Sequence, residues 1–201
     1  RYSRVTGVQT CALPICSVGG FQAVEWAVEE PERFERLALI ATDAKASPWN
    51  IAINETQRMA IEADATFGEE RNDAGRRGLA TARALGLLSY RGPAGYNLTQ
   101  QDREENPAQH RACTYQQYQG EKLCLRYNAY SYHAILNAFD THDVGRGRGG
   151  VEAALGRIRA RTLVVGITTD ILFTPGEMRR LHGLIPGSIY REIDSPLGHD
   201  G

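Results

Sequence analysis

The stretch Cys16-Ser-Val-Gly-Gly-Phe-Gln-Ala-Val-Glu-Trp-Ala27 decides the fold, because it predicts a serine on a sharp turn that leads directly into a helix. The motif G-x-S-x-G puts a nucleophilic serine on such a strained turn, where small residues are needed because the turn is tight. Here Cys16 replaces the first glycine, and the remainder of the motif is intact. Ser17 is therefore a candidate nucleophile, and the backbone N–H of Val18 would point towards a developing oxyanion. The alternative is an ordinary loop, since Ser-x-Gly is a common pattern.

Two later segments place an aspartate and a histidine after predicted strands. Residues 161–167 form a β-branched, apolar run that is typical of a buried parallel strand, and Asp170 follows it. A second short strand is predicted over 189–193, with His199 a few residues beyond it. Taken singly, Asp170 could cap a helix and His199 could belong to a surface loop. Together with Ser17 they follow the triad order of the α/β-hydrolase fold, which differs from the orders of chymotrypsin and subtilisin.

The order of the predicted elements favours an α/β sheet that is interrupted by a helical insertion. A length of 201 residues, 42% of them hydrophobic, suits one globular domain with an inserted subdomain. A helix over 20–30 and a strand over 37–41 continue the sheet after the serine. Helices between two strands of a sheet are typical of a lid that excludes water, although a separate helical domain is the alternative. The predicted helices of this insertion cover residues 48–64, 75–90, 108–127 and 129–141.

These patterns set the expected domain boundaries. Residues 17–46 and 159–201 are expected to form the α/β-hydrolase core, and residues 47–158 the helical lid. In that fold about half of the sheet precedes the serine and a helix follows the histidine. We therefore expect the N-terminal strands to be missing and the chain to be truncated at its C-terminus.

Residues 1–16 are predicted to be a non-native leader. Polar residues and Pro14 stand where a buried strand should precede the serine. Residues 5–15 resemble the in-frame translation of a sequencing adapter, and a glycine codon that lost its first base at the junction would give Cys16. An ordinary divergent N-terminus is the alternative. The parent genomic locus distinguishes the two, because an uninterrupted reading frame through these residues would refute the adapter.

Composition and charge argue against several classes of function. A net charge of −1 gives no support for binding nucleic acid or an anionic membrane. No apolar run reaches the roughly 20 residues of a membrane span, and no secretory signal is present, so a cytoplasmic location is expected. The four cysteines lack metal-ligand spacing, and no metal site is predicted. Cys113 and Cys124 are about three helical turns apart and are expected to be small core residues on one helix face.

With these features in place, the chain resembles the homoserine O-acetyltransferases, a family of α/β-hydrolase-fold enzymes in methionine biosynthesis. The resemblance covers all of the chain except the leader. The segments that carry it are Ser17–Trp26, Asn50–Glu55, Tyr118–Lys122, Arg126–Tyr132, Val165–Phe173 and Asp194–Asp200.

The resemblance implies a catalytic triad with two-step acyl transfer. Ser17 would be the acylated nucleophile, His199 the general base and Asp170 the carboxylate that orients it. Acetyl would pass from acetyl-CoA to Ser17 and then to the hydroxyl of L-homoserine, with acetyl-CoA as a co-substrate and no resident cofactor. Cys16, where the family has glycine, and the missing N-terminal half, which carries the other oxyanion donor, are the departures from the family pattern.

The resemblance also implies residues that hold the amino acid. Arg126 would bind the substrate carboxylate, Asp200 its ammonium group, and Tyr132 would line the pocket; Arg126 could instead be a solvated helix charge. A homodimer through the helical lid is a further expectation. The alternatives on the same scaffold are a succinyl donor, serine as acceptor, an ester hydrolase, and a fragment that is inactive as it stands.

Overall fold

A computed structural model of the chain describes residues 13–102 and 109–201, and these residues divide into two compact units. The sheet unit contains the described residues up to Lys45 together with His142–Thr168 and Phe173–Asp194. The helical unit contains the described residues from Ala46 to Thr141 together with two short segments, Thr169–Leu172 and Ser195–Gly201. The side chains of residues 13–15 are outside this description.

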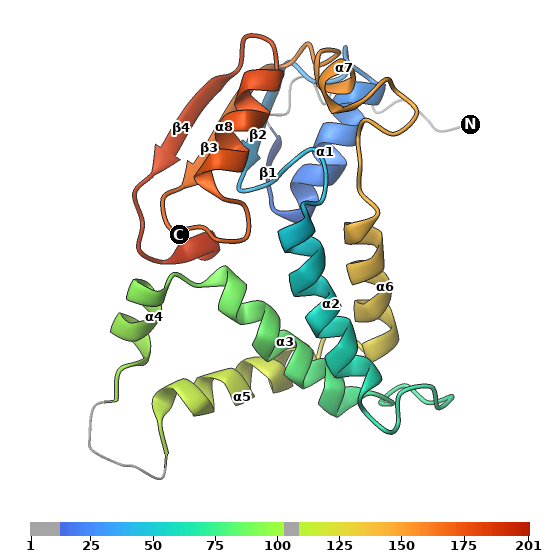
Figure 1. Cartoon of the computed structure of the whole chain (residues 1–201), viewed down its shortest axis with the longest axis vertical. Helices are drawn as coiled ribbons and strands as arrows, with labels where there is room; N and C mark the ends of the chain where they lie inside the picture. Colours follow the sequence, from blue (N-terminus) through green and yellow to red (C-terminus); the bar gives the residue numbers. More distant parts are fainter. Residues whose placement is uncertain (1–12, 103–108) are drawn as a thin grey trace, which may run out of the picture. The chain divides into compact units, whose positions relative to one another are not determined.

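The sheet unit is built on one four-stranded parallel sheet in the order β1-β2-β3-β4 (Figure 1). Helix α1 joins β1 to β2 and packs on both, and α8 does the same for β3 and β4, whereas the helical insertion lies between β2 and β3. The apolar sequence of β3 is buried along most of its length, as expected for a central parallel strand. The elements are β1 (Leu13–Cys16), α1 (Val18–Glu29), β2 (Arg36–Ile40), α7 (Val151–Leu155), β3 (Arg161–Ile167), α8 (Pro175–Leu184) and β4 (Ile189–Ile193).

Strand β1 corrects the expectation that no strand precedes the serine. Residues 13–16 pair in parallel with β2, and Pro14 lies in register with Ala38. Because β1 is at the edge of the described sheet, it is a position where a residue without an N–H is tolerated. Residues 1–12 lie outside the described residues, and the origin of residues 1–16 stays a prediction.

The helical unit is organised around α3, which packs against α2, α5 and α6 (Figure 1). Two glycines allow the close approach of these helices. A Cβ at Gly78 would lie 2.6 Å from the backbone oxygen of Ala60 in α2, and one at Gly120 in α5 would lie 2.6 Å from that of Ala80. The elements are α2 (Pro48–Glu62), α3 (Arg76–Tyr90), α4 (Pro93–Gln100), α5 (Arg111–Leu123), α6 (Ala129–Asp140) and a short 3₁₀ helix, η1 (Gly198–Asp200).

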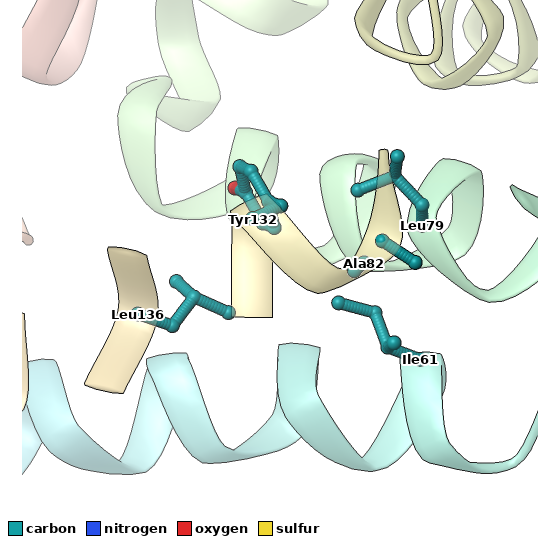
Figure 2. Close-up of a cluster of buried hydrophobic side chains, with 6 residues drawn as sticks. Ile61, Leu79, Ala82, Tyr132 and Leu136 are labelled. Atoms are coloured by element: carbon teal, nitrogen blue, oxygen red, sulfur yellow. The ribbon is translucent and has the colours of Figure 1, made fainter. Parts of the chain in front are cut away.

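One apolar cluster joins α2, α3 and α6. Figure 2 shows labelled side chains of this cluster from all three helices. Its buried members are Ile61, Leu79, Ala82, Ala129, Tyr132 and Leu136.

Four predicted helices of the insertion are present as α2, α3, α5 and α6, with α5 shorter than predicted. Helices α4 and α8 were not predicted. Both begin with a proline in the first turn, and α8 has a capping box between Thr174 and Glu177. The prediction for the cysteines is wrong, because Cys113 is exposed and Cys124 is half-buried just beyond the end of α5. No helix within the described ranges has the length and apolar character needed to cross a membrane.

The end of the predicted lid belongs with the sheet. Residues 142–158 group with the sheet unit rather than with the helices. Ion pairs hold them there: among others, Lys45 Nζ lies 2.9 Å from Asp143 Oδ2, and Arg148 Nη1 lies 2.7 Å from Glu25 Oε2 in α1.

Candidate active site

Ser17 is on a strained turn between β1 and α1, in the sheet unit. Its φ of 54° lies in the left-handed region, which costs a non-glycine residue about 1–3 kcal/mol. The turn is held by its neighbours: the Ser17 N–H donates to the Ala41 carbonyl at 3.0 Å, and the Ser17 carbonyl accepts from the Thr42 hydroxyl at 2.8 Å. The Ser17 hydroxyl makes no capping hydrogen bond to α1. The backbone therefore presents this serine in the conformation expected of a nucleophile elbow.

The residues after Ser17 fit the same role. A Cβ at Gly20 would lie 2.3 Å from the Thr42 hydroxyl oxygen, so only glycine fits where α1 crosses the end of β2. Val18 is the first residue of α1, where a backbone N–H has no partner within the helix, whereas the Gly20 N–H donates to the Ser17 carbonyl at 2.8 Å. No acidic side chain lies in this first turn. The turn can therefore donate to an anion, which is what the predicted oxyanion role of Val18 requires.

Asp170 and His199 form a buried pair in the helical unit. Their Oδ2 and Nδ1 atoms are 2.8 Å apart, and the two side chains are 0% and 8% exposed. Oδ1 of Asp170 accepts the Leu172 N–H at 2.7 Å, which fixes the plane of the carboxylate. A carboxylate only accepts hydrogen bonds, so Nδ1 carries the proton and Nε2 is left as the basic nitrogen. This arrangement suits a general base.

Two glycines allow the segment that carries His199 (residues 194–199, the histidine loop) to pack closely beside the end of α3. Gly198 has a φ of +76°, and a Cβ there would lie 2.3 Å from the backbone nitrogen of Gly92. A Cβ at Gly92 would in turn lie 2.4 Å from the Pro196 carbonyl oxygen. The aromatic ring of Tyr90 lies beside the imidazole of His199, with 5.6 Å between the ring centroids. The loop is thus closely packed against the turn between α3 and α4.

Arg91 is a functional candidate that the sequence analysis missed. Its Nη2 lies 3.3 Å from Oδ2 of Asp200, and the same guanidinium donates to the Tyr115 hydroxyl at 3.0 Å. The two side chains of the ion pair are 29% and 41% exposed, so both are open to solvent next to His199. Nothing in the spacing of Tyr90-Arg-Gly-Pro93 relates it to Asp200, because only the packing of the histidine loop brings them together.

Arg126 lies at the opposite end of α3 from the histidine. Arg76, the first residue of α3, donates to the Cys124 carbonyl at 3.1 Å, whereas Tyr90, the last, contacts the His199 ring. A helix of 15 residues is about 22 Å long. Arg126 is exposed and lines a separate pocket of about 340 Å³ with residues of α3 and the start of α6. The structure does not bring it to the Asp170–His199 pair.

Tyr132 is a core residue of the helical unit rather than part of an open pocket. It is 8% exposed and belongs to the cluster in Figure 2. Its hydroxyl donates to Oε1 of Gln57 at 2.8 Å. Burial raises the pKa of this phenol, so it stays neutral at physiological pH.

Asp43 is a second buried carboxyl group, which the sequence analysis did not single out. It is 1% exposed, follows β2 in the sheet unit, and accepts the Ala44 N–H at 2.7 Å. Burial raises the pKa of this carboxyl to about 6, although the Ala44 N–H and the paired Arg180 guanidinium oppose the shift. Within residues 13–102 and 109–201, no group of three or more His, Cys, Asp or Glu side chains is placed to hold a metal ion.

Comparison with known proteins supports the fold and the resemblance. The alpha/beta hydrolase fold family matches residues 6–201. This chain belongs to that family. The fold class predicted from the sequence is confirmed, and the strained serine after β1 is where α/β-hydrolases carry their nucleophile.

The most similar relatives include two homoserine O-acetyltransferases. That of Cyclobacterium marinum is 48% identical over 184 residues, which cover 92% of this chain and 52% of the relative. That of Thermus thermophilus is 42% identical over 195 residues, which cover 96% of this chain and 49% of the relative. The resemblance drawn from the sequence is therefore confirmed, and the chain spans about half the length of the curated relatives it matches.

Solved structures of α/β-hydrolases match the same part of the chain. Homoserine O-acetyltransferase from Bacillus anthracis has a TM-score of 0.80 at 20% identity, covers 91% and 53% of the two chains, and supports the fold alone. The acetyl esterase MekB has a TM-score of 0.80 at 27% identity and covers 92% and 54%.

Proposed function

We propose that a protein containing this chain transfers an acetyl group from acetyl-CoA to the hydroxyl of L-homoserine, as part of methionine biosynthesis. The observation that carries the proposal is the buried Asp170–His199 pair at 2.8 Å, in a chain whose Ser17 has an elbow backbone. The 48% identity to a homoserine O-acetyltransferase supports this acceptor and donor over other acyl transfers.

The proposed reaction has two steps on one serine. Nε2 of His199 removes the proton from the Ser17 hydroxyl as its oxygen attacks the thioester carbonyl. The backbone N–H of Val18 stabilises the oxyanion, and the CoA thiolate leaves with the proton from His199. In the second step His199 takes the proton of the homoserine hydroxyl, whose oxygen attacks the acyl-enzyme. The proton then returns to the Ser17 oxygen as the ester is released.

The amino acid is proposed to bind between Arg91 and Asp200. A guanidinium matches a carboxylate with two parallel hydrogen bonds, and Asp200 supplies a negative charge for the ammonium group. The ion pair between Arg91 and Asp200 is partly exposed. The carboxylate of homoserine can therefore take the place of Asp200 beside Arg91, and its ammonium group can take the place of Arg91 beside Asp200. The family resemblance implied Arg126 for the substrate carboxylate. Because Arg126 is separated from His199 by about the length of α3, the geometry favours Arg91 instead.

An ester hydrolase is the second candidate. The acetyl esterase MekB and an acetylester hydrolase from Corynebacterium glutamicum share this fold at 27% and 26% identity. Transfer requires that water be excluded and the acceptor be held in place, whereas hydrolysis needs only water. A succinyl donor and serine as acceptor are variants of the transfer reaction, and the same assay compares them.

The test uses a protein of the relatives' full length that contains this chain. It is incubated with acetyl-CoA, with and without L-homoserine, and thiol release is followed. Release that depends on homoserine supports transfer; equal release in its absence means hydrolysis. Ser17→Ala should abolish the acyl-enzyme detected by mass spectrometry, and an adduct on another residue would contradict the mechanism.

The same protein is proposed to be a homodimer through the helical unit. Apolar side chains on the helices, Met59, Leu88 and Ile135, are 59%, 54% and 41% exposed. Light scattering should give twice the chain mass, and a monomer at assay concentrations would contradict the proposal.

A further inference from the structure

Thr169 links the two segments that carry Asp170 and His199. Its hydroxyl donates to the Ser195 carbonyl at 2.6 Å and accepts the Gly198 N–H at 2.9 Å. Thr169 directly precedes Asp170, and Gly198 directly precedes His199. The hydrogen bond from Gly198 therefore joins the residues directly next to the two members of the buried pair, and the hydrogen bond to Ser195 holds the chain four residues before His199.

The start of α4 also holds the histidine loop. The Gly95 N–H at the start of α4 donates to the Pro196 carbonyl at 3.1 Å. This contact fixes the loop against α4, but it does not connect the loop to the segment of Asp170. The Thr169 hydroxyl makes such a connection, and it uses its donor and one of its acceptor sites to do so.

We propose that Thr169 is a positioning residue, which holds Nδ1 of His199 in register with Oδ2 of Asp170. The kinetic part of this proposal rests on the proposed function, whereas its structural part concerns the pair alone. Without the hydroxyl, its hydrogen bonds to the Ser195 carbonyl and from the Gly198 N–H are lost, and this link between the histidine loop and the segment of Asp170 is removed. A small displacement of a general base reduces the rate strongly, because proton transfer depends on the distance and direction of the hydrogen bond.

Two matched pairs of side chains isolate the hydroxyl. The side chains at position 169 in wild type and Thr169→Val have the same shape, but only threonine carries a hydroxyl. Thr169→Ser and Thr169→Ala form the second pair, with smaller side chains of which only serine carries a hydroxyl. Thr168→Val is the control, because the Thr168 hydroxyl bonds to the exposed Asp194 carboxylate at 3.2 Å, in the sheet unit.

The first measurement is NMR of the 201-residue chain with labelled histidine, with His199→Gln to assign the signal. A proton shared between Nδ1 and a buried carboxylate exchanges slowly and gives a downfield resonance. This resonance should be present in wild type, Thr169→Ser and Thr168→Val, and lost or broadened in Thr169→Val and Thr169→Ala. The second measurement is acetyl transfer by the full-length protein, where kcat should fall about 10- to 100-fold in the Val and Ala variants while KM for acetyl-CoA changes less than about twofold.

The outcomes separate the two proposals. If Thr169→Val and Thr169→Ala fold and keep both the resonance and kcat, or if Thr169→Ser loses as much as Thr169→Ala, the positioning role is wrong. If Thr169→Val does not fold, the Ser and Ala pair decides alone. If the resonance behaves as expected but no homoserine-dependent transfer is found in the parent protein, the positioning role stands and the proposed function fails.

Discussion

Ser17 in the sheet unit and the Asp170–His199 pair in the helical unit are supported in different ways. Ser17 is held by the backbone: its φ is 54°, its N–H donates to a carbonyl after β2, and a helix begins at the next residue. The Asp170–His199 pair is held by side chains and close packing, through the Thr169 hydroxyl and the contact of Gly198 with Gly92. The elbow therefore depends on two segments, the turn itself and the residues that follow β2, whereas the pair depends on three segments far apart in the chain.

The largest expected effect comes from Gly198→Ala. The new Cβ would meet the Gly92 backbone nitrogen at 2.3 Å, and an alanine at a φ of +76° is itself strained. Backbone cannot move aside as a side chain can, so we expect a loss of about 3–5 kcal/mol in the free energy of unfolding. Urea denaturation of the chain measures it.

Gly183→Ala is the matched control for this prediction. Gly183 lies in α8, and a Cβ there would meet nothing within 4 Å. Alanine is the better helix former by up to about 1 kcal/mol, so this variant should be neutral or slightly more stable. A Gly198→Ala variant as stable as Gly183→Ala would show that the histidine loop is not packed as described.

This contrast explains what the sequence could predict. The serine turn, the strands β3 and β4 and the helices α2, α3 and α6 have local signals, which are a short motif, β-branched runs and apolar periodicity. The residues around His199 have no such signal. Arg91 and Thr169 act through contacts across 109 and 29 positions, to Asp200 and Gly198, and neither residue type is unusual in its own segment. Arg126 matched a family segment, but a segment match does not give distance from the site.

A second comparison of the two units concerns a buried and a half-buried carboxyl group. Asp43 in the sheet unit has its pKa raised to about 6 by burial, whereas Asp64 in the helical unit has its pKa lowered to about 2 by the Gly78 and Thr66 N–H groups. An unfolded aspartate ionises near pH 3.8. Folding therefore favours the protonated form of Asp43 and the ionised form of Asp64.

The two groups predict opposite dependences of stability on pH. The contribution of Asp43 to the free energy of unfolding is fully present below about pH 4 and is lost as the pH rises through about 6. The loss is at most about 3 kcal/mol. Asp43→Asn should therefore be less sensitive than wild type to a rise from pH 4 to pH 7, whereas Asp64→Asn should lose stability relative to wild type above pH 4. Urea denaturation across this range measures both, and an Asp43→Asn variant with an unchanged pH dependence would contradict the raised pKa.

The smallest effect distinguishes the two arginines of the helical unit. Arg91 pairs with Asp200 beside His199, whereas Arg126 lies beyond the other end of α3. If Arg91 binds the substrate carboxylate, Arg91→Lys in the full-length protein should raise KM for homoserine about tenfold, because an ammonium cannot form the two parallel hydrogen bonds. KM for acetyl-CoA should change little. Arg126→Lys is the matched control and should leave KM for homoserine within about twofold. The reverse result, with the larger change in Arg126→Lys, would mean that the amino acid binds beside α5 and that acyl transfer needs a movement of the helices that brings Arg126 to His199.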